Sequence, residues 1–105
     1  MGLEFASPYD AEPEIVFEAV RVFLDANTAI FCNVSLNQEL KRFDFSFRLP
    51  KWRDDRESND VLLLIEAHQI YLRFFAGMHQ DAEQMVEALA KTLCKLGVVT
   101  EFEEP

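Results

Sequence analysis

The chain has 105 residues, half of which are apolar, and phenylalanine alone contributes 10 of them. This content supports one hydrophobic core, so we expect a single globular domain over residues 1–105, with residues 1–11 and 103–105 poorly ordered. The formal net charge of −9 argues against nucleic acids and anionic membranes as partners and favours a basic protein.

The sequence shows no evident membrane-spanning segment and no evident secretory signal. The longest apolar run, Val61–Ile65, is far shorter than the roughly 20 residues that span a bilayer. Met1–Ser7 has neither the basic start nor the apolar stretch of a secretory signal. Two cysteines, Cys32 and Cys94, are too few for a disulfide framework and fit a reducing compartment. We therefore expect a cytoplasmic protein.

The first predicted element is a helix over residues 13–26. Pro13 suits the first helical turn, and acidic residues gather at the positive end of the helix dipole. Its polar residues form one narrow stripe, so apolar residues cover the rest of its circumference. An arc this wide needs more than one neighbour to cover it. If the last helix leaves Phe17, Val20 and Leu24 exposed, these residues form a homodimer surface.

Two strands with a period of two follow, over residues 30–36 and 42–49. In the first strand we expect Ile30, Cys32, Val34 and Leu36 to share one face, with Cys32 toward the core. In the second we expect Phe43, Phe45, Phe47 and Leu49 to face the core, and Arg42, Asp44, Ser46 and Arg48 to face water.

Residues 61–66 and 70–76 are predicted as two further strands joined by a tight turn. The first of them is apolar on both faces, which is typical of a central strand. On the outer face of the sheet we expect Phe31, Tyr71, Arg73 and Phe75.

A last helix is predicted from Asp81 to Leu96, with a capping box at Asp81 and Gln84 and with Gly97 ending it. Its buried stripe would consist of Ala82, Met85, Val86, Leu89, Leu93 and Leu96. Val98–Phe102 would add a short edge strand or trail into the acidic tail. The predicted fold is α+β, in the order α-β-β-β-β-α, with a four-stranded antiparallel meander and both helices on one face.

Candidate catalytic or metal-binding groups are sparse. His68 and His79 lack partners at metal-ligand spacing, and both cysteines are expected to be buried thiols that behave as small hydrophobic residues. Asp54, Asp55 and Asp60 share a loop that lacks the glycine of calcium-binding loops. We therefore expect no metal, no cofactor and no enzymatic activity, and a small-molecule enzyme is the weakest of three hypotheses.

The long polar loop over residues 50–60 contains the only tryptophan. Six bases and five acids alternate over residues 41–60, so the local charge is close to zero and a nucleic-acid site is disfavoured. Trp52 either folds back onto the core or anchors a partner, since tryptophan is enriched at binding hot spots.

Two hypotheses of protein binding remain. The size, fold class and charge resemble those of immunity proteins, antitoxins and nuclease inhibitors, so the first is a domain that neutralises a basic partner. Its candidate partner-binding residues are Asp10, Glu12, Glu14, Glu18, Trp52, Asp54 and Asp55. The alternative is a dimeric acidic chaperone for a secreted effector, which would hold its client on the apolar arc of the first helix and on the aromatic outer face of the sheet.

Overall fold

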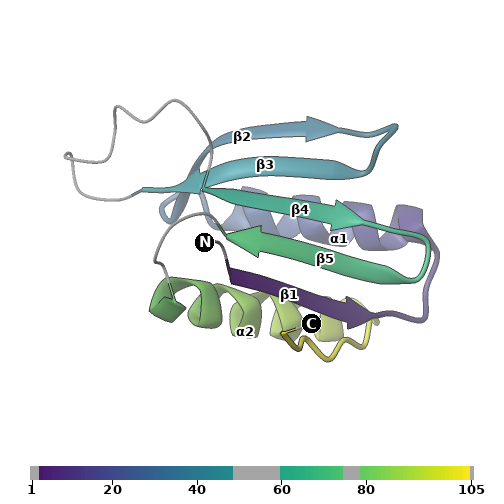
Figure 1. The fold of residues 1–105 in the computed structure, drawn as a ribbon. Helices are drawn as coiled ribbons and strands as arrows, with labels where there is room; N and C mark the ends of the chain where they lie inside the picture. Colours follow the sequence, from purple (N-terminus) through teal and green to yellow (C-terminus); the bar gives the residue numbers. More distant parts are fainter. Residues whose placement is uncertain (1–2, 49–59, 75–78, 105) are drawn as a thin grey trace.

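The computed structural model describes residues 3–48, 60–74 and 79–104 and contains one sheet and two helices (Figure 1). The elements in chain order are β1 Leu3–Pro8, α1 Pro13–Ala26, β2 Phe31–Asn37, β3 Arg42–Phe47, β4 Val61–Ile65, β5 Gln69–Phe74 and α2 His79–Lys95. The predicted α+β class and the predicted order of elements are confirmed from α1 onward. Strand β1 is an addition that the pattern did not predict.

The sheet has the strand order β1-β5-β4-β3-β2, and all neighbouring strands are antiparallel. Strands β2 to β5 form the predicted meander, but β1 adds to the free side of β5, so the whole sheet is not a simple meander. Helix α1 carries the chain from one edge of the sheet to the other (Figure 1). Strand β4 is central, as its apolar character on both faces predicted.

The fifth strand comes from the N-terminal segment and not from residues 98–102. Residues 3–8, which we expected to be poorly ordered, pair with β5 along their whole length. The C-terminal segment instead follows the outer edge of β1, where the backbones of Ala6 and Glu103 exchange two hydrogen bonds of 2.9 Å. The Glu101 amide also donates to the hydroxyl of Ser7 at 2.6 Å. These contacts occupy part of an edge whose backbone groups would otherwise lack partners.

Both helices cover the same face of the sheet. Phe43 of β3 is fully buried against α1, with its ring centroid 4.8 Å from that of Phe17. Phe5 of β1, which the strand register places on the same face, lines a hollow together with Val86 of α2. The predicted inward side chains of β3 that the structure describes, Phe43, Phe45 and Phe47, are all buried. One layer of helices on one sheet therefore encloses a core rich in phenylalanine.

The polar face of β3 departs from the prediction at one position. Ser46, expected to face water, is buried, and its hydroxyl accepts the Asp60 amide at 3.3 Å. The Asp60 carboxylate, also buried, accepts the Phe47 amide at 3.1 Å. Asp60 therefore joins the start of β4 to the end of β3. Asp54 and Asp55, considered with it as cation ligands, lie outside the described residues.

The predicted face of β2 was wrong at Phe31 and Cys32. Phe31 is buried between the rings of Phe45 and Phe47, whereas Cys32 pairs with Ser46 and lies on the outer face. A bulge between Cys32 and Ser35 then shifts the register, and Asn33 within it has a φ of 54°. A bulge inserts one residue and reverses the alternation, so a strict period of two assigns the wrong face on one side of it.

Substitutions at Asn33 should show that the bulge depends on this left-handed backbone. Asn33→Val is expected to lower the free energy of unfolding by about 1–2 kcal/mol, because a β-branched residue is strained at positive φ. Asn33→Gly should change it by less than about 0.5 kcal/mol, since glycine adopts this conformation readily. Urea denaturation measures both variants, and Asn33 is exposed, so lost packing does not confound them. Equal stability of the two variants would contradict the conclusion that the bulge requires a left-handed backbone at Asn33.

Helix α1 buries the residues that we considered as a dimer surface. Phe17, Val20 and Leu24 all belong to the core, so the exposure that a homodimer surface through them required is not found. They are covered because the sheet and α2 lie on adjacent sides of α1. Ile15 and Val22 are the large apolar residues of this helix that stay exposed.

Helix α2 follows its predicted stripe except at the two ends. Ala82, Met85, Val86, Leu89 and Leu93 are buried, but Leu96 is half exposed. The helix begins at His79, so the predicted capping box at Asp81 falls two residues inside it. Gly97, with a φ of 88°, ends the helix as predicted.

Candidate functional site

Helix α1 and the end of α2 border an apolar groove of about 370 Å³. Its lining residues are Glu14, Ile15, Glu18, Ala19, Val22 and Leu96. Ala19 is buried at the floor, and Ile15, Val22 and Leu96 expose roughly half of their surface on the walls. Ile15, Ala19 and Val22 are spaced four and three residues apart, so they form one line along the helix. The groove is thus the uncovered part of the wide apolar arc of α1.

The structure describes four of the seven predicted partner-binding residues, and two of them line this groove. Glu14 and Glu18 are exposed and line it, while Asp10 and Glu12 are exposed in the segment that leads into α1. The other three residues of the set, Trp52, Asp54 and Asp55, lie outside the described residues. The structure therefore places two of the predicted carboxylates, Glu14 and Glu18, beside exposed apolar side chains, and two more ahead of the same helix.

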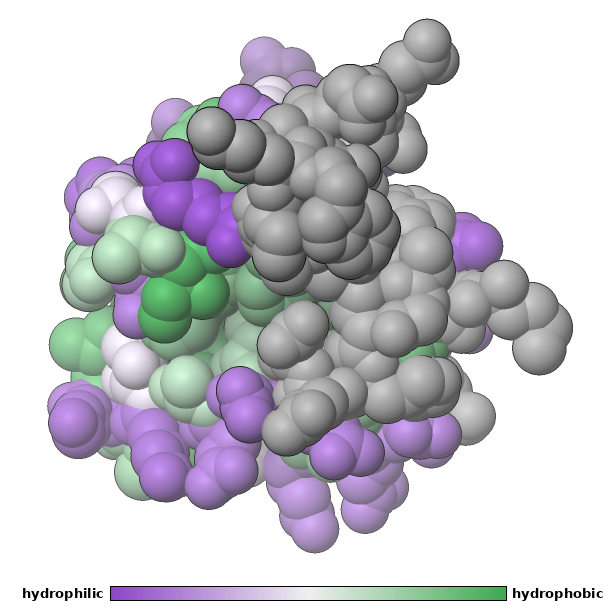
Figure 2. Space-filling view, turned by 90° about the vertical axis from the view of Figure 1, so that its left-hand side faces the viewer, coloured by the Kyte–Doolittle hydropathy of each residue, from purple (hydrophilic) through white to green (hydrophobic). Residues whose placement is uncertain are grey.

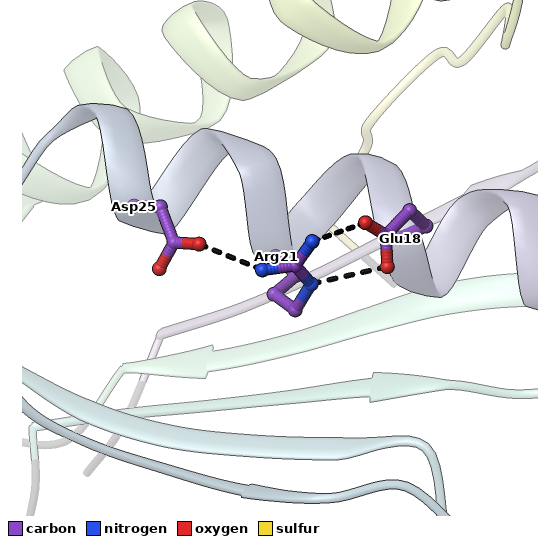
Figure 3. A network of polar contacts seen from close by, with 3 residues as sticks. All are labelled: Glu18, Arg21 and Asp25. Atoms are coloured by element: carbon purple, nitrogen blue, oxygen red, sulfur yellow. Dashed lines mark hydrogen bonds and ion pairs between the residues drawn. The ribbon is translucent and has the colours of Figure 1, made fainter.

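Ion pairs hold the carboxylates of α1 in place. Arg21 lies between Glu18 and Asp25 and contacts both, with its Nε 3.0 Å from Glu18 Oε2 and its Nη1 2.9 Å from Asp25 Oδ2 (Figure 3). The hydrogen bond from Arg21 lowers the pKa of Glu18, so this carboxylate stays charged at neutral pH. Lys41, in the turn between β2 and β3, approaches Glu14 Oε1 to 2.7 Å. The carboxylates of all of these pairs are solvent-exposed, so each pair contributes at most about 1 kcal/mol to stability.

A second hollow, of about 290 Å³, lies at the opposite end of α1. Its lining combines apolar side chains with two amides, namely Phe23, Asn27, Ile30, Phe31, Phe47, Gln84, Met85 and Ala88. Figure 2 views the molecule from the left-hand side of Figure 1 and shows a hydrophobic area bordered by hydrophilic side chains. The residues that line this hollow within the described part of the chain include no titratable group.

The outer face of the sheet is less aromatic than predicted. Phe31 lies in the core, and Phe75 lies outside the described residues. Tyr71 is half-buried and donates its hydroxyl hydrogen to the Glu4 carboxylate, across from β5 to β1. Burial, followed by this hydrogen bond, raises the pKa of Tyr71. This hydrogen bond joins the outer faces of β5 and β1.

Groups suited to catalysis are dispersed over the part of the chain that the structure describes. Contrary to expectation, Cys94 is exposed and Cys32 is only half-buried. His68 is exposed in the turn between β4 and β5. Within residues 3–48, 60–74 and 79–104, no three His, Cys, Asp or Glu side chains are arranged to hold a metal ion. In the same residues, neither helix has the length and apolar character required to cross a bilayer.

The class of protein that the fold and the groove define is an acidic α+β domain with an apolar groove lined by carboxylates. No family model, curated protein or solved structure matches this chain. The function is therefore inferred from the groove and its charges alone.

Sequence reasoning identified the acids of this site but not its apolar partners as a group. Ile15 and Val22 belong to the apolar arc that required a cover, and Leu96 was assigned to the buried stripe of α2. Their shared exposure depends on where α2 ends relative to α1, which no local pattern encodes. The only sequence signal was an apolar arc too wide for a single neighbour.

Proposed function

We propose that this protein is a small acidic protein-binding domain that neutralises or inhibits a basic partner protein. The observation that carries the proposal is the pair of exposed carboxylates, Glu14 and Glu18, beside the exposed apolar residues Ile15 and Val22. Asp10 and Glu12 are also exposed, in the segment that leads into α1. Interfaces commonly combine an apolar centre with a charged rim. The proposed activity is binding and involves no catalysis.

The charges would act mainly on the rate of encounter. A chain with a net charge of −9 attracts a basic partner over several ångströms, and complementary potentials raise association rates by 10-fold to about 1,000-fold. The apolar residues would act mainly on dissociation, because desolvated side chains at an interface determine how long a complex lasts. This division of roles predicts binding that weakens with salt but does not vanish.

The dimeric chaperone is the less supported alternative. Its two motivating features were the wide apolar arc of α1 and an aromatic outer face containing Phe31, Tyr71 and Phe75. Most of the arc is buried, with Ile15 and Val22 as its large exposed residues, and Phe31 lies in the core. The remaining exposed apolar residues of β2, Val34 and Leu36, lie at the sheet edge opposite β1.

Charge reversal on α1 tests the proposal. The double variant Glu14→Lys/Glu18→Lys should reduce capture of a basic partner from a lysate of the source organism by about 10-fold or more at low salt. The matched control is Glu83→Lys/Glu87→Lys on α2, which has the same spacing, the same change of net charge and exposed side chains. Capture is quantified by mass spectrometry at low and high salt.

Three results would contradict the proposal. The first is an equal loss of capture in both double variants, which would mean that binding depends on the net charge of the protein and not on the position of the carboxylates. The second is capture that ignores salt, since steering by exposed charges is screened within about 10 Å at 0.1 M salt. The third is the absence of any captured basic protein.

A further inference from the structure

The groove has the dimensions and spacing of a helix-packing surface. Residues 14–22 of α1 border it over about 12 Å, or a little more than two helical turns. Ile15 and Val22 stand on either side of the smaller Ala19, so the line of side chains dips in its middle. Packed helices place a large side chain of one helix into such a dip on the other. Leu96, at the end of α2, provides the facing wall.

We propose that this groove binds an amphipathic basic helix of the partner protein. A large apolar side chain of that helix would lie over Ala19, and lysine or arginine residues beside it would meet Glu14 and Glu18. This proposal rests on the proposed function and adds the binding mode and the chemical class of the bound segment. Helices bound in grooves are typically held by apolar residues at positions i, i+3 or i+4, and i+7.

Charge selects this occupant over a second copy of the chain. A two-fold interface through the groove would bring the same surface of each copy together, including both Glu14 and Glu18 rims. Each copy carries a net charge of −9, and like charges placed across an interface cost several kcal/mol. With a basic helix the electrostatic interaction across the interface becomes attractive, and the apolar contacts stay the same.

The ion pairs already present at the rim do not block a basic ligand. Lys41 contacts one oxygen of Glu14, and the pair is exposed on the carboxylate side. Arg21 lies between Glu18 and Asp25, so its single positive charge faces two carboxylates. Asp10 and Glu12 add further exposed negative charge at the same end of α1. The rim therefore retains an excess of negative charge for an incoming cation.

The test uses a synthetic helical peptide of about 14 residues, or four turns, with leucines on one face and lysines on the other. A peptide of the same composition, with the leucines scattered around the helix, controls for charge. Binding to the full-length protein is measured by fluorescence anisotropy, and the contact surface is mapped by amide chemical shifts in NMR.

Two double variants of the protein distinguish binding at the groove from non-specific binding to exposed apolar residues elsewhere on the surface. Ile15→Ser/Val22→Ser removes apolar walls that are 52% and 41% exposed. Ile30→Ser/Val34→Ser is matched in residue type and exposure, at 49% and 44%, and neither residue lines the groove. We expect the first variant to weaken binding of the amphipathic peptide by 10-fold or more and the second by less than 2-fold. Shift changes should concentrate at residues 14–22 and 96.

The outcomes show separately whether the inference about the groove fails and whether the proposed function fails. If both peptides bind equally, or if the two double variants lose affinity equally, the groove inference is overturned while charge-driven binding stands. Absence of binding by the amphipathic peptide also overturns the groove inference, and the proposed function is then judged by the lysate capture alone. Preferential binding of the amphipathic peptide, lost only in Ile15→Ser/Val22→Ser, supports the inference.

Discussion

Val20→Asp is expected to prevent this protein from folding, whereas Val22→Asp, two residues further along the same helix, is expected to fold. Val20 is 0% exposed in the core between α1 and the sheet, and Val22 is 41% exposed at the groove. An aspartate at position 20 must be buried without a partner, either charged or protonated, at a cost of several kcal/mol. Domains of this size are stable by only about 5–15 kcal/mol, so the loss removes most or all of the stability.

Circular dichroism and urea denaturation of the two variants measure the difference. The free energy of unfolding of Val22→Asp should lie within about 0.5 kcal/mol of that of the unmodified protein, because the introduced aspartate reaches solvent. The pair matches residue type, helix and introduced charge, so only burial differs. A folded Val20→Asp together with an unfolded Val22→Asp would mean that α1 is rotated about its axis, with the groove face packed inside.

The second large effect is expected at the centre of the core. Phe43→Ala should lower the free energy of unfolding by about 3–5 kcal/mol, since it removes a ring that is fully buried and packed against Phe17. For a domain of this size such a loss corresponds to a drop in Tm of about 15 °C or more. Thermal and urea unfolding measured on the same samples would give both values.

Leu36→Ala is the matched control for this prediction. Leu36 lies directly opposite Phe43 in the β2–β3 register, on the same side of the sheet, yet it is 48% exposed. Its truncation should change stability by less than about 0.5 kcal/mol. A loss at Leu36 comparable to the loss at Phe43 would show that the helices extend over the β2 edge, contrary to the structure.

The elements that could be predicted are those whose evidence is local. The alternation of Phe43, Phe45 and Phe47 identified β3 and its buried face, and the apolar run Val61–Ile65 identified the central strand. Proline at the start of α1 and Gly97 after α2 marked where these helices begin and end. Each signal arises from backbone preference or from burial along a few consecutive residues, so a single segment is enough to show it.

The sequence-based predictions were wrong where the local structure depends on a distant segment of the chain or on a single backbone angle. Strand β1 is short and mixed, and its partner β5 follows more than 60 residues later, so pairing defines it rather than pattern. The bulge at Asn33 reversed the faces of Phe31 and Cys32 because one inserted residue inverts the alternation. Leu96 continues the buried stripe of α2 in sequence, but it lies at the open groove beside α1 and is 48% exposed.

For the candidate site, the sequence alone determined the acidic charge, the apolar width of α1 and the position of Glu14 and Glu18 on one side of it. Only the tertiary structure decided which part of the apolar arc stays open. The sheet and α2 cover Phe17, Val20 and Leu24, and they leave Ile15 and Val22 beside the carboxylates. The physical reason is that an amphipathic pattern records how much of a helix must be buried, whereas the directions of its neighbours decide which residues remain for a partner.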